Sequence, residues 1–203
     1  MNFYELLKQW RLYEQKQTHQ KNLYSKAVIG NNFCSEKVFG ANSILNINIV
    51  NRSNDPSKIK IGNYCNIFGS LFCNEYGEIN IGDYVFMNNG CSIRSDHKVV
   101  IGSHCLFGPR VEIIDTDSHP LSRSKRHQQA RLIPEQLINT YEADGKPIII
   151  GDDVWVCLGS LILGGVAIGD GSIIAAHSVV TKSIPPMSIA AGIPAQVIGR
   201  VPS

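Results

Sequence analysis

A parallel β-helix is the fold class that this chain of 203 residues predicts, and two features of its apolar residues predict it. The first is an isoleucine-glycine pair that recurs every twenty and later every eighteen residues, at Ile61-Gly62, Ile81-Gly82, Ile101-Gly102, Ile150-Gly151 and Ile168-Gly169. The second is an apolar residue at every sixth position inside these units, which no helix of about 3.6 residues per turn keeps on one face. Three sixes make one triangular turn, and each short strand then stacks on the strand of the turn before it.

The six-residue series is unbroken in the C-terminal half of the chain, where it comprises Ile150, Val156, Ile162, Ile168, Ile174 and Val180. A second series lies four residues after members of the first and holds small residues: Cys65, Val85, Cys91, Cys105, Val111, Val154, Ser160, Val166, Ser172 and Ser178. We expect the aliphatic residue to point into the prism and the small one to pack near a corner. Three of the six cysteines fall in the small series and no CxxC pair occurs, so we expect packing and not a disulfide or zinc framework.

The chain should open with an amphipathic helix within a cap over residues 1–25. Its apolar residues recur at helical spacing, at Phe3, Leu6, Leu7, Trp10 and Tyr13. The coil should follow over residues 26–184, with the Gly-Asn and Gly-Asp pairs supplying bends that tolerate positive φ. The pattern fails at about 114–147, which we interpret as a long excursion loop. Pro185 and Pro186 should end the repeats and open a tail over 185–203, since proline cannot donate to a ladder.

Composition limits the partners of the chain. Charged residues make up 18% of it, and the net charge is +2 with acids and bases interspersed, so we expect no nucleic acid as a partner. No apolar run reaches the ~20 residues that a bilayer-spanning helix needs, and the charged N-terminus lacks the core of a signal peptide. We therefore expect one domain without membrane insertion, located in the cytoplasm.

The segment IGDDVWVCLGSLILGGVAIGDGSIIAAHSVVTKSIPPMSIAAGIPAQVIGRV, residues 150–201, resembles the C-terminal half of the hexapeptide-repeat acyltransferases. Galactoside, maltose and serine O-acetyltransferases are members of this family, and others act on bacterial polysaccharides. The resemblance implies a left-handed coil, although right-handed crossovers are the general rule for parallel strands. It also implies acetyl-CoA as the co-substrate, no metal, and a homotrimer whose active sites lie between subunits.

Three residues are candidates for the catalytic site: His119, Asp117 and Asn88. His119 lies in DTDSHP, where the excursion opens, and resembles the catalytic histidine of the family's O-acetyltransferases. An alcohol needs a base that titrates near neutrality to take its proton as it attacks a thioester, and imidazole suits that task. Asp117 could orient the ring, as could Asp115 or a backbone carbonyl. Asn88 matches by position an asparagine that binds the reacting hydroxyl or acyl end in galactoside-type members, and Asn89 carries the same amide.

The resemblance also implies that acetyl-CoA binds along the last coils. The residues at the matching positions are Trp155, Leu158, Gly159, Ala176, Thr181 and Lys182. Lys182 can meet a CoA phosphate as a point charge. The chain departs from the family pattern at Cys157 and His177, where glycine is usual, and at Gln196, where a basic residue is frequent. Cys157 has no histidine adjacent in sequence that would make it a nucleophile.

The leading hypothesis is an acetyl-CoA-dependent O-acetyltransferase that acts on a carbohydrate hydroxyl of a bacterial surface polysaccharide, a capsule or its sugar precursor. A basic run over 122–127, with Arg131 beyond it, is either a solvated surface or a site for an anionic acceptor or the CoA phosphates. The alternatives are an N-acetyltransferase of a nucleotide-linked amino sugar and a scaffold without activity. No GxGxxG unit precedes the coil, and His97, His104 and His119 lack the pattern of a zinc site shared between subunits.

Overall fold

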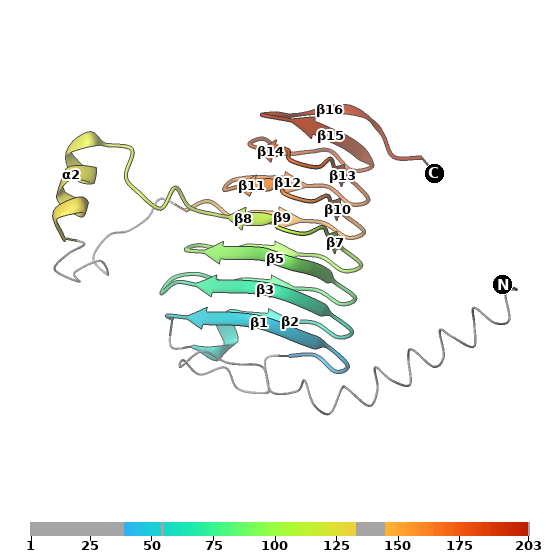
Figure 1. The fold of residues 1–203 in the computed structure, drawn as a ribbon, viewed down its shortest axis with the longest axis horizontal. Coiled ribbons are helices and arrows are strands. Elements are labelled where there is room, and N and C mark those ends of the chain that lie inside the picture. Colours follow the sequence, from blue (N-terminus) through green and yellow to red (C-terminus); the bar gives the residue numbers. More distant parts are fainter. Residues whose placement is uncertain (1–38, 54, 133–144, 203) are drawn as a thin grey trace, which may run out of the picture.

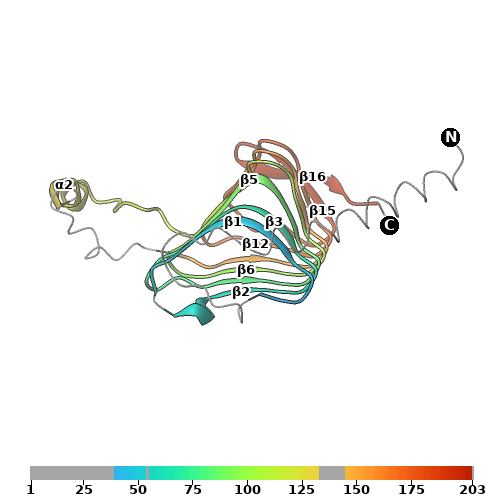
Figure 2. The same cartoon turned by 60° about the horizontal axis from the view of Figure 1, so that its bottom comes forward.

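The computed structural model describes residues 39–53, 55–132 and 145–202, so the expected N-terminal cap lies outside the described residues. Parallel strands stack in successive turns along the molecule (Figure 1). Seen from a second direction, each turn has a triangular outline with three faces (Figure 2). The expected β-helix of six-residue repeats is confirmed, and the stack is consistent with the left-handed coil that the resemblance implies.

The strands divide among three faces of the prism. The first face holds β2 (Ile59–Ile61), β4 (Ile79–Ile81), β6 (Val99–Ile101), β9 (Ile148–Ile150) and β12 (Ala167–Ile168). The second face holds β7 (Leu106–Phe107), β10 (Trp155–Val156), β13 (Ile173–Ile174) and β15 (Ser188–Gly192). The third face holds β8 (Glu112–Ile114), β11 (Leu161–Leu163) and β14 (Val179–Val180).

Three longer strands bend round from the second face to the third: β1 (Ile44–Asn51), β3 (Asn66–Cys73) and β5 (Phe86–Ser95). The start of β5 pairs with β7 and its end pairs with β8, which fixes the bend between the two faces. A short 3-10 helix, η2 (Pro56–Lys58), precedes β2. We call the edge between the first and second faces corner 1, the edge between the second and third corner 2, and the edge between the third and first corner 3.

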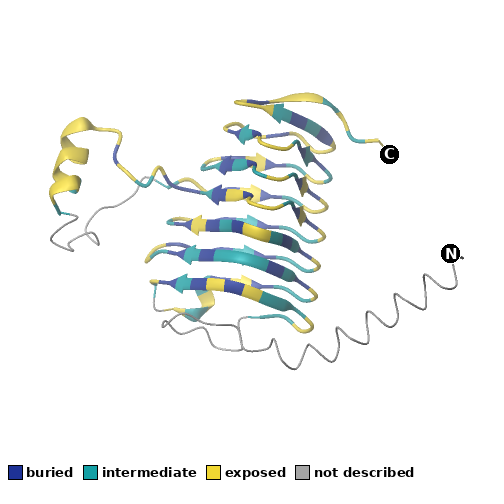
Figure 3. Cartoon of the chain, viewed as in Figure 1, coloured by how far each residue is buried: buried dark blue, intermediate teal, exposed yellow. Residues whose placement is uncertain are grey.

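The core of the prism is a stack of aliphatic side chains. All six members of the C-terminal series, from Ile150 to Val180, are at most 2% exposed, and the ten small residues of the second series are at most 1% exposed. Buried and more exposed positions alternate along the strands (Figure 3). Because a shift of one residue would turn every aliphatic side chain outward, burial of these two columns specifies the register of the coil.

The glycines at corner 1 correct one expectation. Positive φ lies not at the glycine but two residues later, as at Tyr84 (φ 57°) after Gly82. The glycine is needed instead for close approach, because a Cβ on Gly82 would lie 2.8 Å from the carbonyl carbon of Gly102 in the next turn. Tyr64 and His104 share the backbone conformation of Tyr84, and the three rings stack at centroid distances of 4.9 and 5.1 Å.

One side chain in each turn links corner 1 of neighbouring turns. Asn63 Oδ1 accepts a hydrogen bond from Ala41 N at 2.8 Å, and Asp83 Oδ1 accepts from Asn63 N at 2.6 Å. The same bond to the backbone of the preceding turn is made by Ser103, Asp152 and Asp170. Pro186 takes the next place in this column, above Gly169.

The C-terminal segment adds two strands to the stack. Ile184 bridges Ile168 in parallel, and β15 then pairs with β13. The last strand, β16 (Ala195–Arg200), returns antiparallel to β15. In the part of the chain that the structure describes, no helix is long and apolar enough to cross a membrane.

The excursion leaves the prism at corner 3, between β8 and β9. Its two ends are held together by an antiparallel bridge between Thr116 and Gly145. Beside this bridge, the fully buried Asp115 carboxylate accepts hydrogen bonds from the Ser95 hydroxyl at 2.7 Å and from the backbone N–H groups of Asp96 and His97 at 2.8 and 3.0 Å. Asp115 therefore fixes the base of the excursion to the coil.

Within the expected loop lies a helix, α2 (Arg123–Leu132). It stands away from the prism at the outer end of the excursion and buries none of its residues (Figures 1 and 2). Its sequence, RSKRHQQARL, consists largely of good helix formers but has no apolar face. We expected only a loop here because the sequence has no hydrophobic period, and the structure corrects this expectation with a helix.

Candidate active site

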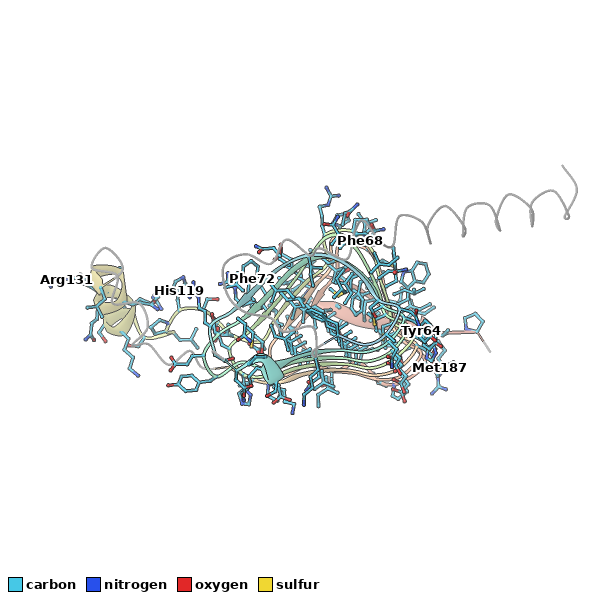
Figure 4. The ribbon with its side chains drawn as sticks, turned by 90° about the horizontal axis from the view of Figure 1, so that it is seen from below. Tyr64, Phe68, Phe72, His119, Arg131 and Met187 are labelled. Atoms are coloured by element: carbon cyan, nitrogen blue, oxygen red, sulfur yellow. The ribbon has the colours of Figure 1, made fainter. Side chains whose placement is uncertain are left out.

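His119 lies on the segment that joins β8 to α2, outside the packed prism and exposed to solvent. Figure 4 shows it between the coil and the helix. Its ring nitrogen Nδ1 is 2.9 Å from the side-chain oxygen Oε1 of Gln129, and its backbone N–H donates to the Asp117 carbonyl at 2.7 Å. The imidazole is thus attached to the excursion through one of its two nitrogens, Nδ1.

Helix α2 is joined to the His119 segment by a second set of bonds. The Arg126 guanidinium donates to the Pro120 carbonyl at 3.0 Å and also to the Leu121 carbonyl. The Arg126 backbone N–H donates to the Ser122 carbonyl at 3.0 Å. Pro120 is buried although its neighbours are exposed. Residues 119–129 therefore form one local unit, and it orients the imidazole.

The two aspartates before His119 have different positions. Asp115 is buried at the base of the excursion, where its carboxylate binds the coil. Asp117 is exposed and contacts His119 through its backbone carbonyl. Among the described residues, the ring nitrogen Nδ1 is bonded by Gln129 and by neither aspartate. Sequence reasoning missed Gln129 because a contact between a loop residue and a helix residue ten positions later follows no repeat.

Asn88 lies at corner 2, where β5 bends from the second face to the third. Its Oδ1 accepts a hydrogen bond from the backbone of Asn89 at 2.7 Å, and Gly90 follows with a φ of 76°. The register of β5 against β3 shifts at this bend. The amide of Asn88 is half-buried, whereas Asn89 is exposed.

Three of the cofactor candidates lie on the same corner as Asn88, in later turns: Leu158, Gly159 and Ala176. The backbone N–H of Gly159 donates to the Pro109 carbonyl at 2.9 Å, and the backbone N–H of His177 donates to the Leu158 carbonyl at 2.9 Å. These turns are therefore stacked in register. Gly159 has a φ of 67°, and a Cβ there would lie 2.6 Å from Nδ1 of His177. The His177 ring therefore lies over Gly159, on the surface that the family resemblance assigns to the pantetheine arm.

Trp155 and Cys157 flank this corner from the second face. Trp155 is 48% exposed and pairs with Leu106 and Ile173 in the outer layer of that face. Cys157 is partly exposed, and burial raises the pKa of its thiol. A raised pKa lowers the fraction of thiolate, which is the nucleophilic form. Cys157 thus lacks the activation that a catalytic cysteine needs.

Thr181 and Lys182 follow β14 at corner 3, the corner from which the excursion departs, and both are exposed. Beside them an open hollow of about 430 Å³ lies against the first face. It is lined mainly by apolar groups, among them Ile149, Ala167 and Pro186, with Ser183 at its edge.

Within one chain the candidates form two sets. The corner-3 set comprises Asp117, His119, Thr181 and Lys182, and the corner-2 set comprises Asn88, Leu158, Gly159 and Ala176 together with Trp155 on the adjoining face. The third face, with β8, β11 and β14, separates them. Within residues 39–53, 55–132 and 145–202, no group of three or more histidine, cysteine, aspartate or glutamate side chains is arranged to hold a metal ion.

Comparisons with known proteins bear on a large part of the chain. The model of the family described as bacterial transferase hexapeptide (six repeats) matches residues 147–182. The galactoside O-acetyltransferase of Lactococcus lactis is 33% identical over 70% of this chain and 63% of its own length. The galactoside O-acetyltransferase of Escherichia coli is 38% identical over 62% of this chain and 56% of its own length. The chain spans about three fifths of the length of the curated relatives that it matches.

A solved structure of a hexapeptide-repeat acetyltransferase is also similar to this chain. A hexapeptide-repeat acetyltransferase from Vibrio cholerae, complexed with acetyl-CoA, matches with a TM-score of 0.58 and 26% identity over 82% of this chain and 74% of that chain. The similarity in fold therefore covers 82% of the chain, and the similarity in sequence covers 62–70% of it.

Proposed function

We propose, from the premise that this chain belongs to the hexapeptide-repeat transferase family, that it transfers the acetyl group of acetyl-CoA to a carbohydrate hydroxyl. The observation that carries the proposal is the exposed His119, whose Nδ1 is occupied by Gln129 at the head of the excursion. The acceptor we propose is a bacterial surface polysaccharide, a capsule or its sugar precursor.

His119 acts as the general base in this reaction. Its Nε2 takes the proton of the acceptor hydroxyl while the hydroxyl oxygen bonds to the thioester carbonyl carbon. The carbon-sulfur bond then breaks, and the imidazolium returns the proton to the departing sulfur. The products are the acetyl ester and the free thiol of CoA. Asn88 is the side chain we assign to the acyl end or the reacting hydroxyl, through its amide.

The corner-2 surface fits the acyl arm of acetyl-CoA. Gly159 and Ala176 are small, and Ala176 is exposed, so a narrow chain can approach the backbone there. Trp155 offers an exposed aromatic face beside it. Lys182 supplies a positive charge for a phosphate, and Thr181 supplies a hydroxyl. The His177 ring narrows the groove, which is the main departure of this site from the family pattern.

A homotrimer unites the two sets of candidates. One subunit contributes the corner-3 set with His119 and Lys182, and its neighbour contributes the corner-2 set with Asn88 and Ala176. A cyclic assembly of three copies repeats the same contact at each interface and closes on itself. The separation of the two sets within one chain supports this arrangement, because the third face of the prism lies between them.

The charge of helix α2 favours an anionic acceptor. It carries Arg123, Lys125, Arg126 and Arg131 and no acidic residue. Arg126 is engaged with the carbonyls of the His119 segment, whereas Arg123, Lys125 and Arg131 have no ion pair among the residues that the structure describes. Their position beside the proposed base favours an acidic saccharide, since clustered charge raises the local concentration of an oppositely charged substrate.

The test is release of CoA thiol from acetyl-CoA in the presence of matched neutral and sialic-acid-containing oligosaccharides. We expect turnover with a saccharide acceptor and a preference for the acidic one, which falls as salt is added. Turnover with amino sugars alone would contradict O-acetylation, and equal rates on both kinds of oligosaccharide would contradict the role of α2.

A further inference from the structure

Gln129 makes a contact that neither the repeat nor the family resemblance assigns to any residue. We propose that Gln129 is a positioning residue: its side-chain oxygen holds His119 in the tautomer that carries its proton on Nδ1, so that Nε2 is the basic atom. This inference rests on the proposed function, in which His119 is the general base. By this proposal α2 takes part in the reaction, although it stands away from the coil.

The tautomer follows from the chemistry of the two side chains. A neutral imidazole has one N–H donor and one acceptor nitrogen, and which nitrogen is protonated depends on its hydrogen-bond partner. The Oε1 atom of Gln129 only accepts, so at 2.9 Å it requires a proton on Nδ1 of His119. The lone pair is then on Nε2, the ring nitrogen that does not contact Gln129. If the amide nitrogen faced Nδ1 instead, the proton would be on Nε2 and His119 could not act as a base there.

Gln129 can hold the ring because α2 is itself held. Arg126 lies one turn before Gln129 on the same side of the helix and is bonded to the carbonyls of Pro120 and Leu121. In the described part of the chain, the charged residues bonded to this segment are Asp117, through its backbone carbonyl, and Arg126 on α2. The helix contributes no side chain to the core of the prism, so these local bonds set its position relative to His119.

Three variants separate positioning from general damage. Gln129→Leu removes the acceptor, Gln129→Glu keeps an acceptor and adds a negative charge, and Gln128→Leu is the matched control. Gln128 is exposed on α2 whereas Gln129 is half-buried, and the neighbouring position directs Gln128 about 100° away round the helix. For Gln129→Leu we expect kcat to fall about 10–100-fold with an unchanged KM for acetyl-CoA, because the reacting atom loses its alignment. Gln128→Leu should match the parent.

Gln129→Glu supplies the decisive readout. It should keep most of the parental turnover and move the acid limb of the kcat/KM profile to higher pH, because a carboxylate beside the ring favours the protonated imidazole. ¹⁵N NMR of His119 should report a proton on Nδ1 in the parent and in Gln128→Leu, and a changed distribution in Gln129→Leu. This second readout does not depend on turnover.

The outcomes distinguish this inference from the function on which it rests. If His119→Ala stays active, the proposed base is wrong, and the positioning role is wrong with it. If His119→Ala is inactive while Gln129→Leu matches Gln128→Leu in both kcat and ¹⁵N spectrum, only the role of Gln129 is overturned. Loss of activity in Gln129→Glu without a displaced acid limb would likewise overturn it, because a structural contact alone would then explain the result.

Discussion

His119 is the single residue on which turnover should depend most. Removing a general base costs roughly 10²–10⁴ in rate, which is ~3–5 kcal/mol of barrier. We therefore expect His119→Ala to lose turnover by that factor while CoA affinity and assembly are unchanged, because the side chain lies outside the packed core. Steady-state rates and calorimetric titration with CoA measure both effects.

The pH profile of the parent supplies the control. Since only neutral imidazole accepts a proton, kcat/KM should fall on the acid side through the protonation of one group. His119→Asn has a similar shape and cannot take up the proton, so it should fail like alanine. More than about a tenth of parental activity in His119→Ala, with the acid limb intact, would rule out this base and direct attention to His127 or Asp117.

The cysteines should differ in reactivity according to their burial. Desolvation raises the pKa of Cys105 to about 11 and that of Cys73 to about 12, and it also raises the pKa of Cys65 and Cys91. A raised thiol pKa leaves little thiolate at pH 8, so alkylation of these four should be slow. Mass spectrometry of iodoacetamide-treated protein should find Cys157 modified before them, because it is partly exposed.

Cys157→Ser separates exposure from catalysis. We expect it to retain turnover, since the thiol is not activated and the proposed transfer from acetyl-CoA is direct. Acetyl-CoA should slow alkylation of Cys157, which adjoins Leu158 in the proposed groove. Abolished turnover in the serine variant, together with an acetylated thiol, would instead indicate a covalent intermediate.

The corner glycines act at the scale of the turn. A Cβ on Gly82 would lie 2.7 to 2.9 Å from Ser103 and from the backbone of Gly102, whereas a Cβ on Gly199 would meet nothing within 4 Å. We expect Gly82→Ala to lower the free energy of unfolding by about 1–3 kcal/mol, as overpacking does. Gly199→Ala should change it by less than about 0.5 kcal/mol. Urea unfolding followed by circular dichroism compares the two, and equal stabilities would show that the turns can separate at no cost.

The elements differ in how far the sequence could predict them. The column from Ile150 to Val180 was predictable because an aliphatic residue recurs at every sixth position. The point where the excursion leaves the coil was predictable because this six-residue spacing breaks there. Helix α2 was not, because an exposed helix without an apolar face has no hydrophobic period. The bond between His119 and Gln129 depends on the path of that helix and on no pattern of residue types. The positive φ at Tyr84 was missed because glycine is the residue that tolerates it most readily.

At the scale of the whole molecule, assembly should be measurable by mixing inactive variants. His119→Ala damages the corner-3 set, and Ala176→Glu blocks the corner-2 set with bulk and charge at an exposed position. In trimers formed from an equal mixture, about a quarter of the interfaces combine an intact corner 3 with an intact corner 2 of the neighbour. We expect turnover to return to about that fraction, and light scattering to give about three times the monomer mass.

The matched control mixes His119→Ala with Lys182→Glu. Both changes lie in the corner-3 set, so no interface becomes complete and turnover should stay low. Recovery in this control, or none in the first mixture, would contradict a site shared in this way. A monomer that turns over at micromolar concentration would exclude it altogether.

Pro186 has a consequence for the length of the molecule. If the last turn kept the corner-1 hydrogen bonds of the other turns, the first turn of a second molecule could stack on it. Molecules would then join end to end as a filament. At corner 1 the column passes from Asp170 to Pro186, which has no N–H to donate and no side-chain oxygen to accept. β16 then pairs with β15 in the opposite direction, so the final turn no longer presents a parallel template. The C-terminal end of the prism therefore offers no parallel template at this face for the end-to-end growth of a filament.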